Sequence, residues 1–267
     1  MKRLSLIMLF LLSVCGLYAD NGTSVSEGLS NNSVKAIYQD DSGYMWLGTK
    51  NGLNRYDGYE IKSYYYDDGT TQKNDIVSIL ADSDGLMWLG TFNGVVLFDP
   101  HINGFLDPAG RFSGEFPEGV VTGIWIRDAS DVWVATKKGL YRFHDGQCAV
   151  VEELCGKHIN AMGYGGDDYI LMDVVSDGLY CMNTLTGELN HIEVKCDGQR
   201  SPANTIIFDG SSATWLFANE GEIVRYDRID GTARMIGSTW STRKGNQIHS
   251  AICRGNSTML LAADSVI

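Results

Sequence analysis

The chain has 267 residues, of which 44% are hydrophobic and 20% are charged, a composition typical of soluble, well-packed proteins. Its formal net charge of −12 would repel a phosphate backbone, which argues against a nucleic-acid partner. The sequence holds 31 Gly and only 4 Pro, so it favours many tight turns over proline-rich linkers.

Residues 1–19 are predicted to form a secretory signal peptide. Lys2 and Arg3 precede an apolar stretch from Leu4 to Leu17, and the small residue Ala19 ends the segment. A basic start, a short apolar middle and a small residue at the cleavage site are the features of such a peptide. An uncleaved membrane anchor is the alternative, and it is disfavoured because a span takes about 20 apolar residues. Export to the periplasm is therefore expected.

The rest of the chain, residues 20–267, repeats a segment of similar sequence. "QDDSGYMWLGTKNGLNRYDG" begins at Gln39, and "ADSDGLMWLGTFNGVVLFD" begins at Ala81. A six-residue spacing marks five copies: Trp46–Gly52, Trp88–Gly94, Trp133–Gly139, Met172–Gly178 (with Met in place of Trp) and Trp215–Gly221. A sixth copy begins near residue 246 and has Leu260 at the Trp position. Periods of about 40–45 residues are typical of propeller blades or helical arrays.

Local sequence decides between these two architectures. Each copy consists of short apolar runs separated by turn residues, and Asn-Gly between such runs is a strong β-hairpin signal. No copy has an i, i+3, i+4 pattern long enough for a helix. The predicted fold is therefore all-β: a β-propeller of four-stranded antiparallel blades, five complete and a partial sixth, forming an incomplete ring. The predicted blades span residues 30–68, 74–107, 118–154, 157–196, 202–237 and, in part, 246–267.

The repeated residues are predicted to be structural. The Trp residues should be largely buried and fill the wedge between neighbouring blades, the glycines should let backbones approach closely, and the Asp of the first turn should accept backbone N–H bonds. The residues assigned to the structural repeat are Trp46, Gly52, Trp88, Gly94, Trp133, Gly139, Gly178, Trp215 and Gly221.

"LSNNSVKAIYQDDSGYMWLGTKNGLNRYDG", which begins at Leu29, resembles the two-component regulator propeller repeat. That repeat is found in the periplasmic sensor region of hybrid two-component system histidine kinases. The resemblance is strong in copies one and two, fair in copy three and weak beyond, and it covers roughly residues 28–267. It implies a periplasmic sensor that recognises oligosaccharides from polysaccharide breakdown and signals to a histidine kinase. The chain shows no kinase motif of its own.

The resemblance also implies partners. These are an oligosaccharide ligand and the remaining propeller, membrane and kinase segments of a longer receptor, with a homodimer of the full-length receptor as an open alternative. Because family rings have about seven blades, we expect residues 1–267 to be a fragment that is prone to aggregate when expressed alone.

Sugar recognition needs an exposed aromatic side chain beside planar hydrogen-bonding groups. The connection between copies five and six offers such a set, although Trp240 could equally be a packing residue of the last strand. The candidate ligand-binding residues are Trp240, Arg243, Lys244, Asn246, Tyr64, Tyr66 and Arg111. Which glycan is bound, and whether its site lies in this chain, stay open.

No catalytic, metal or cofactor site is predicted. The five histidines show no paired ligand spacing, and the five cysteines of the mature chain cannot pair completely, so free buried thiols are expected. Cys148 and Cys155 are the only pair close enough in sequence to test for a disulfide. The alternative to a sensor is a periplasmic propeller enzyme, a lyase or glycosidase acting on polysaccharide.

Overall fold

The computed structural model describes residues 28–67, 72–166, 168–195, 201–209, 213–218, 222–237, 248–254 and 258–263. The predicted signal peptide (1–19), Gly221, Trp240, Arg243, Lys244 and Asn246 lie outside them. Within the described part, no helix combines the length and the apolar character that a membrane crossing requires.

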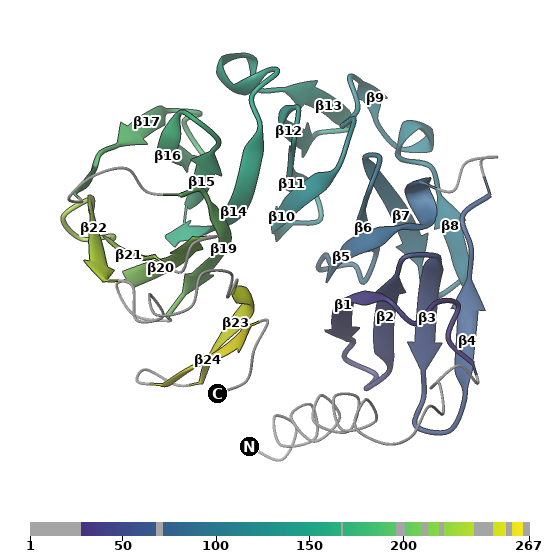
Figure 1. The fold of residues 1–267 in the computed structure, drawn as a ribbon. Helices are drawn as coiled ribbons and strands as arrows, with labels where there is room; N and C mark the ends of the chain where they lie inside the picture. The colour runs from purple at the N-terminus through teal and green to yellow at the C-terminus, as the bar shows by residue number, and fades with distance from the viewer. Residues whose placement is uncertain are drawn as a thin grey trace.

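The fold is all-β and consists of consecutive antiparallel blades (Figure 1). Blades 1 to 5 each have four core strands, and a sixth has two. The strands of blades 1 and 2 are β1 (Val34–Gln39), β2 (Met45–Thr49), β3 (Gly52–Tyr56), β4 (Ile61–Tyr64), β5 (Ile76–Ala81), β6 (Met87–Thr91), β7 (Val95–Asp99) and β8 (Gly104–Leu106). Those of blades 3 and 4 are β10 (Val121–Asp128), β11 (Asp131–Thr136), β12 (Gly139–His144), β13 (Gln147–Val150), β14 (Ile159–Gly166), β15 (Tyr169–Val174), β16 (Gly178–Asn183) and β17 (Leu189–Ile192). Those of blades 5 and 6 are β19 (Ala203–Phe208), β20 (Ala213–Ala218), β21 (Ile223–Asp227), β22 (Thr232–Gly237), β23 (Ile248–Arg254) and β24 (Thr258–Ala263).

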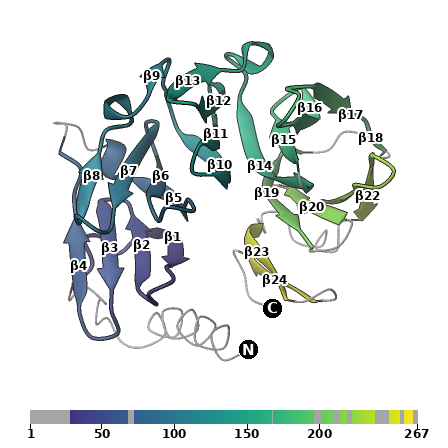
Figure 2. The same ribbon diagram turned by 180° about the vertical axis from the view of Figure 1, so that it is seen from behind.

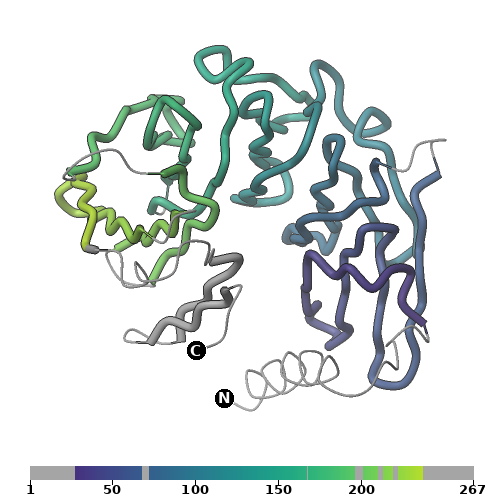
Figure 3. The backbone as a smooth tube through the Cα atoms, viewed as in Figure 1, coloured from purple at the N-terminus to yellow at the C-terminus, as the bar shows by residue number. Residues whose placement is uncertain are grey.

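The blades form an open arc. The first strands β1, β5, β10, β14, β19 and β23 lie side by side in this order, and the chain passes from blade to blade in sequence order (Figure 3). Blade 1 and strands β23 and β24 stand at the two ends of the arc (Figures 1 and 2). This incomplete ring of five full blades and part of a sixth confirms the predicted fold class.

Two short strands cover outer blade edges. β9 (Ser113–Gly114) pairs in parallel with β13, and β18 (Val194–Lys195) pairs in parallel with β22. Each belongs to the connection that precedes its blade. An uncovered edge strand can pair with another chain, so these strands protect blades 3 and 5. Three single 3-10 turns, η1 (Gln72–Asn74), η2 (Pro108–Gly110) and η3 (Glu152–Leu154), also lie in connections.

The aspartate of the repeat accepts a hydrogen bond from the tryptophan of the same copy, and we call this bond the pin of the Trp. The indole Nε1 donates to the carboxylate six residues earlier at 2.7 Å for Trp46–Asp40, 3.0 Å for Trp88–Asp82 and 3.2 Å for Trp215–Asp209. The same carboxylates accept backbone N–H bonds within their own turns. This turn, between the first and second strands, explains why Asp and Trp recur together.

The Trp residues of the repeat also have a packing role at the joints between neighbouring blades. Each joint buries one face of two neighbouring sheets: Trp46 packs with blade 2 residues, Trp88 with blade 3 and Trp133 with blade 4. The exposed fractions of these three side chains are 0%, 0% and 2%. Trp215 is only half-buried, which corrects the prediction that it is largely buried.

The equivalence of Met172 to these tryptophans is wrong. Met172 packs toward blade 3 with Trp133, whereas Leu171 faces blade 5 and holds the position of the repeat Trp. The register shows why: Val174 pairs with Gly178 across three turn residues, whereas Thr49 pairs with Gly52 across two. The turn is one residue longer, so the six-residue spacing persists at copy four while its first member points the other way.

Candidate functional site

The two ends of the arc of blades differ in construction. We call the end with the turns between strands 1 and 2 and between strands 3 and 4 the Asp-turn face. We call the opposite end, with the turns between strands 2 and 3 and the connections between blades, the connection face. Antiparallel strands in sequence order place these turns at opposite ends of every blade.

The connection face carries a pocket of about 650 Å³ between blades 2 and 3. Its walls come from η1, from the β6–β7 and β11–β12 turns, from the connection that precedes blade 3, and from the turn after η3. The lining residues are Lys73, Asn93, Glu115, Phe116, Pro117, Glu118, Lys138, Tyr141, Cys155 and Gly156.

A backbone latch fixes one wall of this pocket. The Gly94 amide donates to the Gly119 carbonyl at 2.8 Å, and the Gly119 amide donates to Asn93 Oδ1 at 3.2 Å. Gly94 has φ of 78°, and a Cβ there would collide with the Pro117 carbonyl oxygen. The repeat glycine therefore lets the connection lie directly against the β6–β7 turn.

Charged and aromatic groups meet at this pocket. Lys138 Nζ lies 2.8 Å from Glu118 Oε2, and both side chains are exposed. The hydrogen bond from Lys138 lowers the pKa of Glu118. Phe116 is half-buried and its ring lies 6.2 Å from that of Phe143. Burial, helped by the charge of Glu115, raises the pKa of the Tyr141 phenol, which stays protonated near neutral pH. The pocket thus offers ammonium donors, carboxylate acceptors and an aromatic face.

The three described residues among the predicted ligand-binding set lie in different environments. Tyr64 is buried, its hydroxyl donates to Asn103 at 2.8 Å, and its ring packs against Trp46 and Phe98. Its assignment as a ligand contact is corrected, because its ring and hydroxyl serve the joint between blades 1 and 2.

Of the other two residues, Tyr66 lies beside the pocket, whereas Arg111 does not line it. The half-buried ring of Tyr66 has Lys73 Nζ 5.1 Å from its centre, and Lys73 lines the pocket. Arg111 is exposed over the ring of Phe112, in the connection that later supplies the wall with Phe116. The structure therefore leaves Tyr66 as a pocket neighbour, and it places Arg111 in the same connection as the pocket wall.

Sequence reasoning missed the pocket residues themselves. Asn93 and Lys138 stand in turns whose repeat character drew attention to the neighbouring glycines, and Phe116 belongs to no repeat. The available signal was the length of the segment from Pro100 to Gly119, in which the structure places β8 before the connection that forms the pocket wall.

The cysteines differ from expectation in one respect. The described cysteines Cys148, Cys155 and Cys181 are free, so Cys148 and Cys155 are not joined. Cys148 and Cys181 are buried, and burial raises the pKa of the Cys148 thiol to about 12. Cys155 is exposed and lines the pocket, which corrects the expectation of buried thiols at this position.

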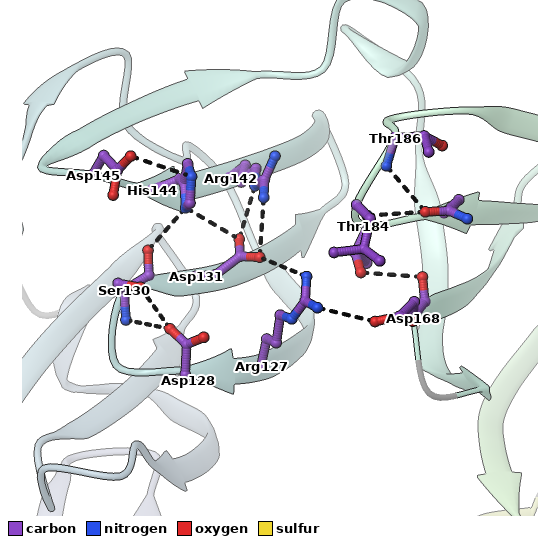
Figure 4. Close-up of polar contacts among 12 residues, drawn as sticks. Arg127, Asp128, Ser130, Asp131, Arg142, His144, Asp145, Asp168, Thr184 and Thr186 are labelled. Atoms are coloured by element: carbon purple, nitrogen blue, oxygen red, sulfur yellow. Dashed lines mark hydrogen bonds and ion pairs between the residues drawn. The ribbon is translucent and has the colours of Figure 1, made fainter.

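A polar cluster on the Asp-turn face links blades 3 and 4 (Figure 4). Arg142 donates to both oxygens of Asp131, at 2.8 and 3.0 Å. Arg127 Nη2 lies 3.0 Å from Asp168 Oδ1 on blade 4, and its Nη1 lies 3.9 Å from Asp131 Oδ2. The Asp168 carbonyl accepts from Thr184 N and Oγ1. No group of three or more His, Cys, Asp and Glu side chains within the described segments could hold a metal ion.

Comparison with known proteins points to one repeat family. Residues 28–51 and 72–93 match the family model for the two component regulator propeller. A 38-residue stretch is 50% identical to "Histidine kinase P4" of Formosa agariphila, covering 14% of this chain and 3% of that protein.

Solved structures share the fold. The extracellular domain of the proposed hybrid two-component system BT3049 from Bacteroides thetaiotaomicron aligns over 91% of this chain with a TM-score of 0.70 and 18% identity. That of BT4673 from the same organism aligns over 90% with a TM-score of 0.70 and 19% identity. Virginiamycin B lyase from Staphylococcus aureus, at 15% identity, aligns over 88% of this chain and 85% of its own, with a TM-score of 0.63.

The chain spans 34% and 35% of the length of the two B. thetaiotaomicron structures. At these identities the likeness shows the propeller fold alone, whereas the two matched repeats, in blades 1 and 2, carry the sequence relationship. Blades 1 and 2 therefore each carry a match to the two-component regulator propeller repeat.

Proposed function

We propose that the chain is the ligand-sensing periplasmic propeller of a hybrid two-component sensor. The observation that carries this proposal is the match of residues 28–51 and 72–93 to the regulator propeller repeat. The sequence features of a signal peptide in residues 1–19 agree with an exported protein. In this proposal, the histidine kinase that receives the signal belongs to a longer receptor.

The proposed ligand is an oligosaccharide released from a polysaccharide, and the pocket between blades 2 and 3 is its proposed site. Sugar hydroxyls both donate and accept hydrogen bonds, while the C–H face of a sugar ring packs on an aromatic ring. Lys138 supplies donors, Glu115 supplies acceptors, and Phe116 supplies an aromatic face in one pocket. Concave sites with a few polar groups and an aromatic wall are typical of small-ligand binding.

Calorimetry with a panel of oligosaccharides tests this proposal. The variants are Phe116→Ala and Glu115→Gln, and the matched control is Tyr59→Ala, which removes an aromatic side chain that is 97% exposed on the Asp-turn face. We expect Phe116→Ala to weaken binding about tenfold or more, while Tyr59→Ala binds as the wild type does. Loss of binding in Trp240→Ala but not in Phe116→Ala would move the site to the predicted connection after blade 5.

Thiol labelling gives a second readout of the same site. Cys155 is exposed in the pocket, while Cys148 and Cys181 are buried. With Cys15, Cys196 and Cys253 replaced by Ser, a bound oligosaccharide should slow maleimide labelling of Cys155. An unchanged labelling rate under saturating oligosaccharide would exclude this pocket, and no binding by any panel member would contradict the sugar-sensing proposal.

The rival function is a propeller enzyme that cleaves polysaccharide. The fold likeness to a lyase keeps this rival in view, although it shows no shared chemistry. The same oligosaccharide panel separates the two, because a sensor returns its ligand unchanged. Chromatography of the ligand after prolonged incubation at about equimolar protein would reveal shorter products only if the chain is an enzyme.

A further inference from the structure

Blade 3 lacks the Asp–Trp hydrogen bond that blades 1, 2 and 5 share. Strand pairing aligns Ile126 and Val132 with Gln39 and Met45 of blade 1, so Arg127 stands where Asp40 pins Trp46. Blade 3 thus carries a cation at the position of the pinning carboxylate. The turn itself keeps the same length, so this is a change of residue and not of register.

This replacement leaves a buried donor without its partner. Trp133 is 2% exposed, and its indole Nε1 has no hydrogen-bond partner in the described structure. Buried N–H groups without partners are costly, and each one in a native protein calls for an explanation. Local rules that are broken inside an otherwise regular repeat tend to mark positions with another role.

Arg127 connects its own blade to the next one through ion pairs. Its guanidinium lies between Asp131 of blade 3 and Asp168 of blade 4, at 3.9 and 3.0 Å. Asp131, whose side chain is 3% exposed, is held in turn by Arg142. Charges of alternating sign therefore run from β12 across the joint to the β14–β15 turn (Figure 4).

This bridge differs from the other ion pair between blades in the described structure. Lys35 and Asp75 join blades 1 and 2 at 2.6 Å on the connection face, and Asp75 is 12% exposed. Arg127 and Asp168 are 30% and 38% exposed, so salt reaches their bridge more easily. Blade 1 keeps the Asp40–Trp46 hydrogen bond beside its ion pair, whereas blade 3 has the ion pair and no partner for the Trp133 indole.

We propose that Arg127 is an electrostatic clasp that sets the spacing of blades 3 and 4 on the Asp-turn face. When its charge is screened or removed, the two blades separate at this face while the apolar contacts around Trp133 keep the joint together on the inside. The arc of blades then has one joint whose geometry responds to ionic strength, or to an anionic group that competes with Asp168 for Arg127.

Distance measurement between spin labels tests the clasp in the full chain. Cysteines at Gln147 of blade 3 and Leu185 of blade 4, both exposed on the Asp-turn face, carry the labels, with Cys15, Cys155, Cys196 and Cys253 replaced by Ser. Arg127→Gln and Asp168→Asn each remove one charge of the bridge. Lys138→Gln is the control, because it removes one lysine charge from an exposed ion pair on the opposite face.

We expect a narrow distribution of the distance between the spin labels in the parent protein. In Arg127→Gln and in Asp168→Asn, the mean distance should be longer and the distribution broader. The double variant should show no further change. Raising NaCl from about 50 mM to about 1 M, where the Debye length falls to about 3 Å, should shift the parent toward the variants and leave the variants unchanged. The control should match the parent at both concentrations. Equal distance distributions in the parent and Arg127→Gln would overturn the proposal.

Hydrogen exchange provides a second measurement that does not depend on the labels. Amides in the turn around Asp168 should exchange about 1.5- to 5-fold faster in Arg127→Gln, the range that exposed ion pairs allow. Those in blade 2 should keep their rates. Faster exchange of similar size in every blade would show that Arg127 serves overall stability, and the clasp would be refuted.

Discussion

A single aspartate side chain stabilises the turn between the first and second strands of a blade. Asp82 is 7% exposed and accepts hydrogen bonds from Trp88 Nε1 and from the amides of Asp84 and Leu86. One carboxylate therefore satisfies three donors in a turn of a few residues. The same residue type recurs at Asp40 and Asp209, where each carboxylate accepts from the Trp indole and from one backbone amide of its turn.

Removing this carboxylate should destabilise blade 2. In Asp82→Ala, the buried Trp88 indole N–H and the two turn amides lose their acceptor, which should lower the free energy of unfolding by about 1–3 kcal/mol or more. Denaturant titration followed by tryptophan fluorescence measures the change. Asp84→Ala is the control, because its side chain is exposed in the same turn. Equal midpoints for the two variants would show that the pin is energetically unimportant.

His158 should make the protein sensitive to acid. Its Nε2 is buried without a partner in the described structure, and burial, followed by the charge of Lys137, lowers its pKa from 6.5. The unfolded chain therefore binds this proton more readily than the folded chain, so the contribution of His158 to stability is present above about pH 6.5 and is lost as pH falls through its lowered folded pKa.

Substitution of His158 tests this sign. Stability measured by urea unfolding should fall between about pH 7 and pH 5 in the wild type, and part of this fall should disappear in His158→Gln. His191, which is exposed, provides the control substitution His191→Gln. If both variants keep the full pH dependence of the wild type, His158 does not contribute to it.

At the scale of strands, small residues set how closely blades approach. Gly90 lies on the second strand of blade 2, and a Cβ there would meet Ser78 Oγ and stand 2.7 Å from Val121 Cγ1 of blade 3. Gly48, Gly123 and Gly163 are equally close to the next blade. A methyl group at any of these positions must push two sheets apart, because packed cores have no spare room.

Gly90→Ala should therefore destabilise the joint between blades 2 and 3. Overpacking of this kind costs about 1–3 kcal/mol, measured as a loss in the free energy of unfolding. Gly110→Ala is the matched control, since no atom lies within 4 Å of its added Cβ. A Gly90→Ala protein as stable as the Gly110→Ala control would mean that the joint relaxes freely around the new methyl group.

The element scale also shows where sequence reasoning succeeded and where it could not. Turn residues and the repeat period predicted the four-stranded blades, because hairpin turns need particular residues at particular places. The prediction failed at copy four. Met172 keeps its six-residue spacing to Gly178, but a longer turn places Leu171 at the position of the repeat Trp. A one-residue insertion in a turn is invisible when two neighbouring residues are both apolar, and it reverses the face that each one presents.

The pocket was beyond sequence reasoning for a different reason. Its walls combine two repeat turns, at Asn93 and Lys138, with a connection at Phe116 that belongs to no repeat, and the three lie far apart in the chain. The packing of blade 3 against blade 2 brings them together. Tyr66 was close to this pocket, but the reason given for it was an aromatic run and not its contact with Lys73.

At the scale of the whole molecule, the main contacts between the described blades run between neighbours. The inner strands touch in the order β1, β5, β10, β14 and β19, and each apolar cluster belongs to one joint. A protein built in this way behaves as a one-dimensional array, in which stability is a sum of blade terms and joint terms. Damage at one joint should therefore stay local.

Trp88→Ala tests this locality. The indole is fully buried in the joint between blades 2 and 3, so its removal should cost about 3–5 kcal/mol. Hydrogen exchange followed by mass spectrometry should show lost protection in β6 and β11, which flank this joint, while β15 and β20 keep nearly the protection of the wild type. Leu171→Ala, at the equivalent position of blade 4, is the reciprocal variant and should weaken β15 and β20 while sparing β6. An equal loss across all five blades in both variants would mean that the arc unfolds as a single cooperative unit, with coupling that the contacts between neighbouring blades do not explain.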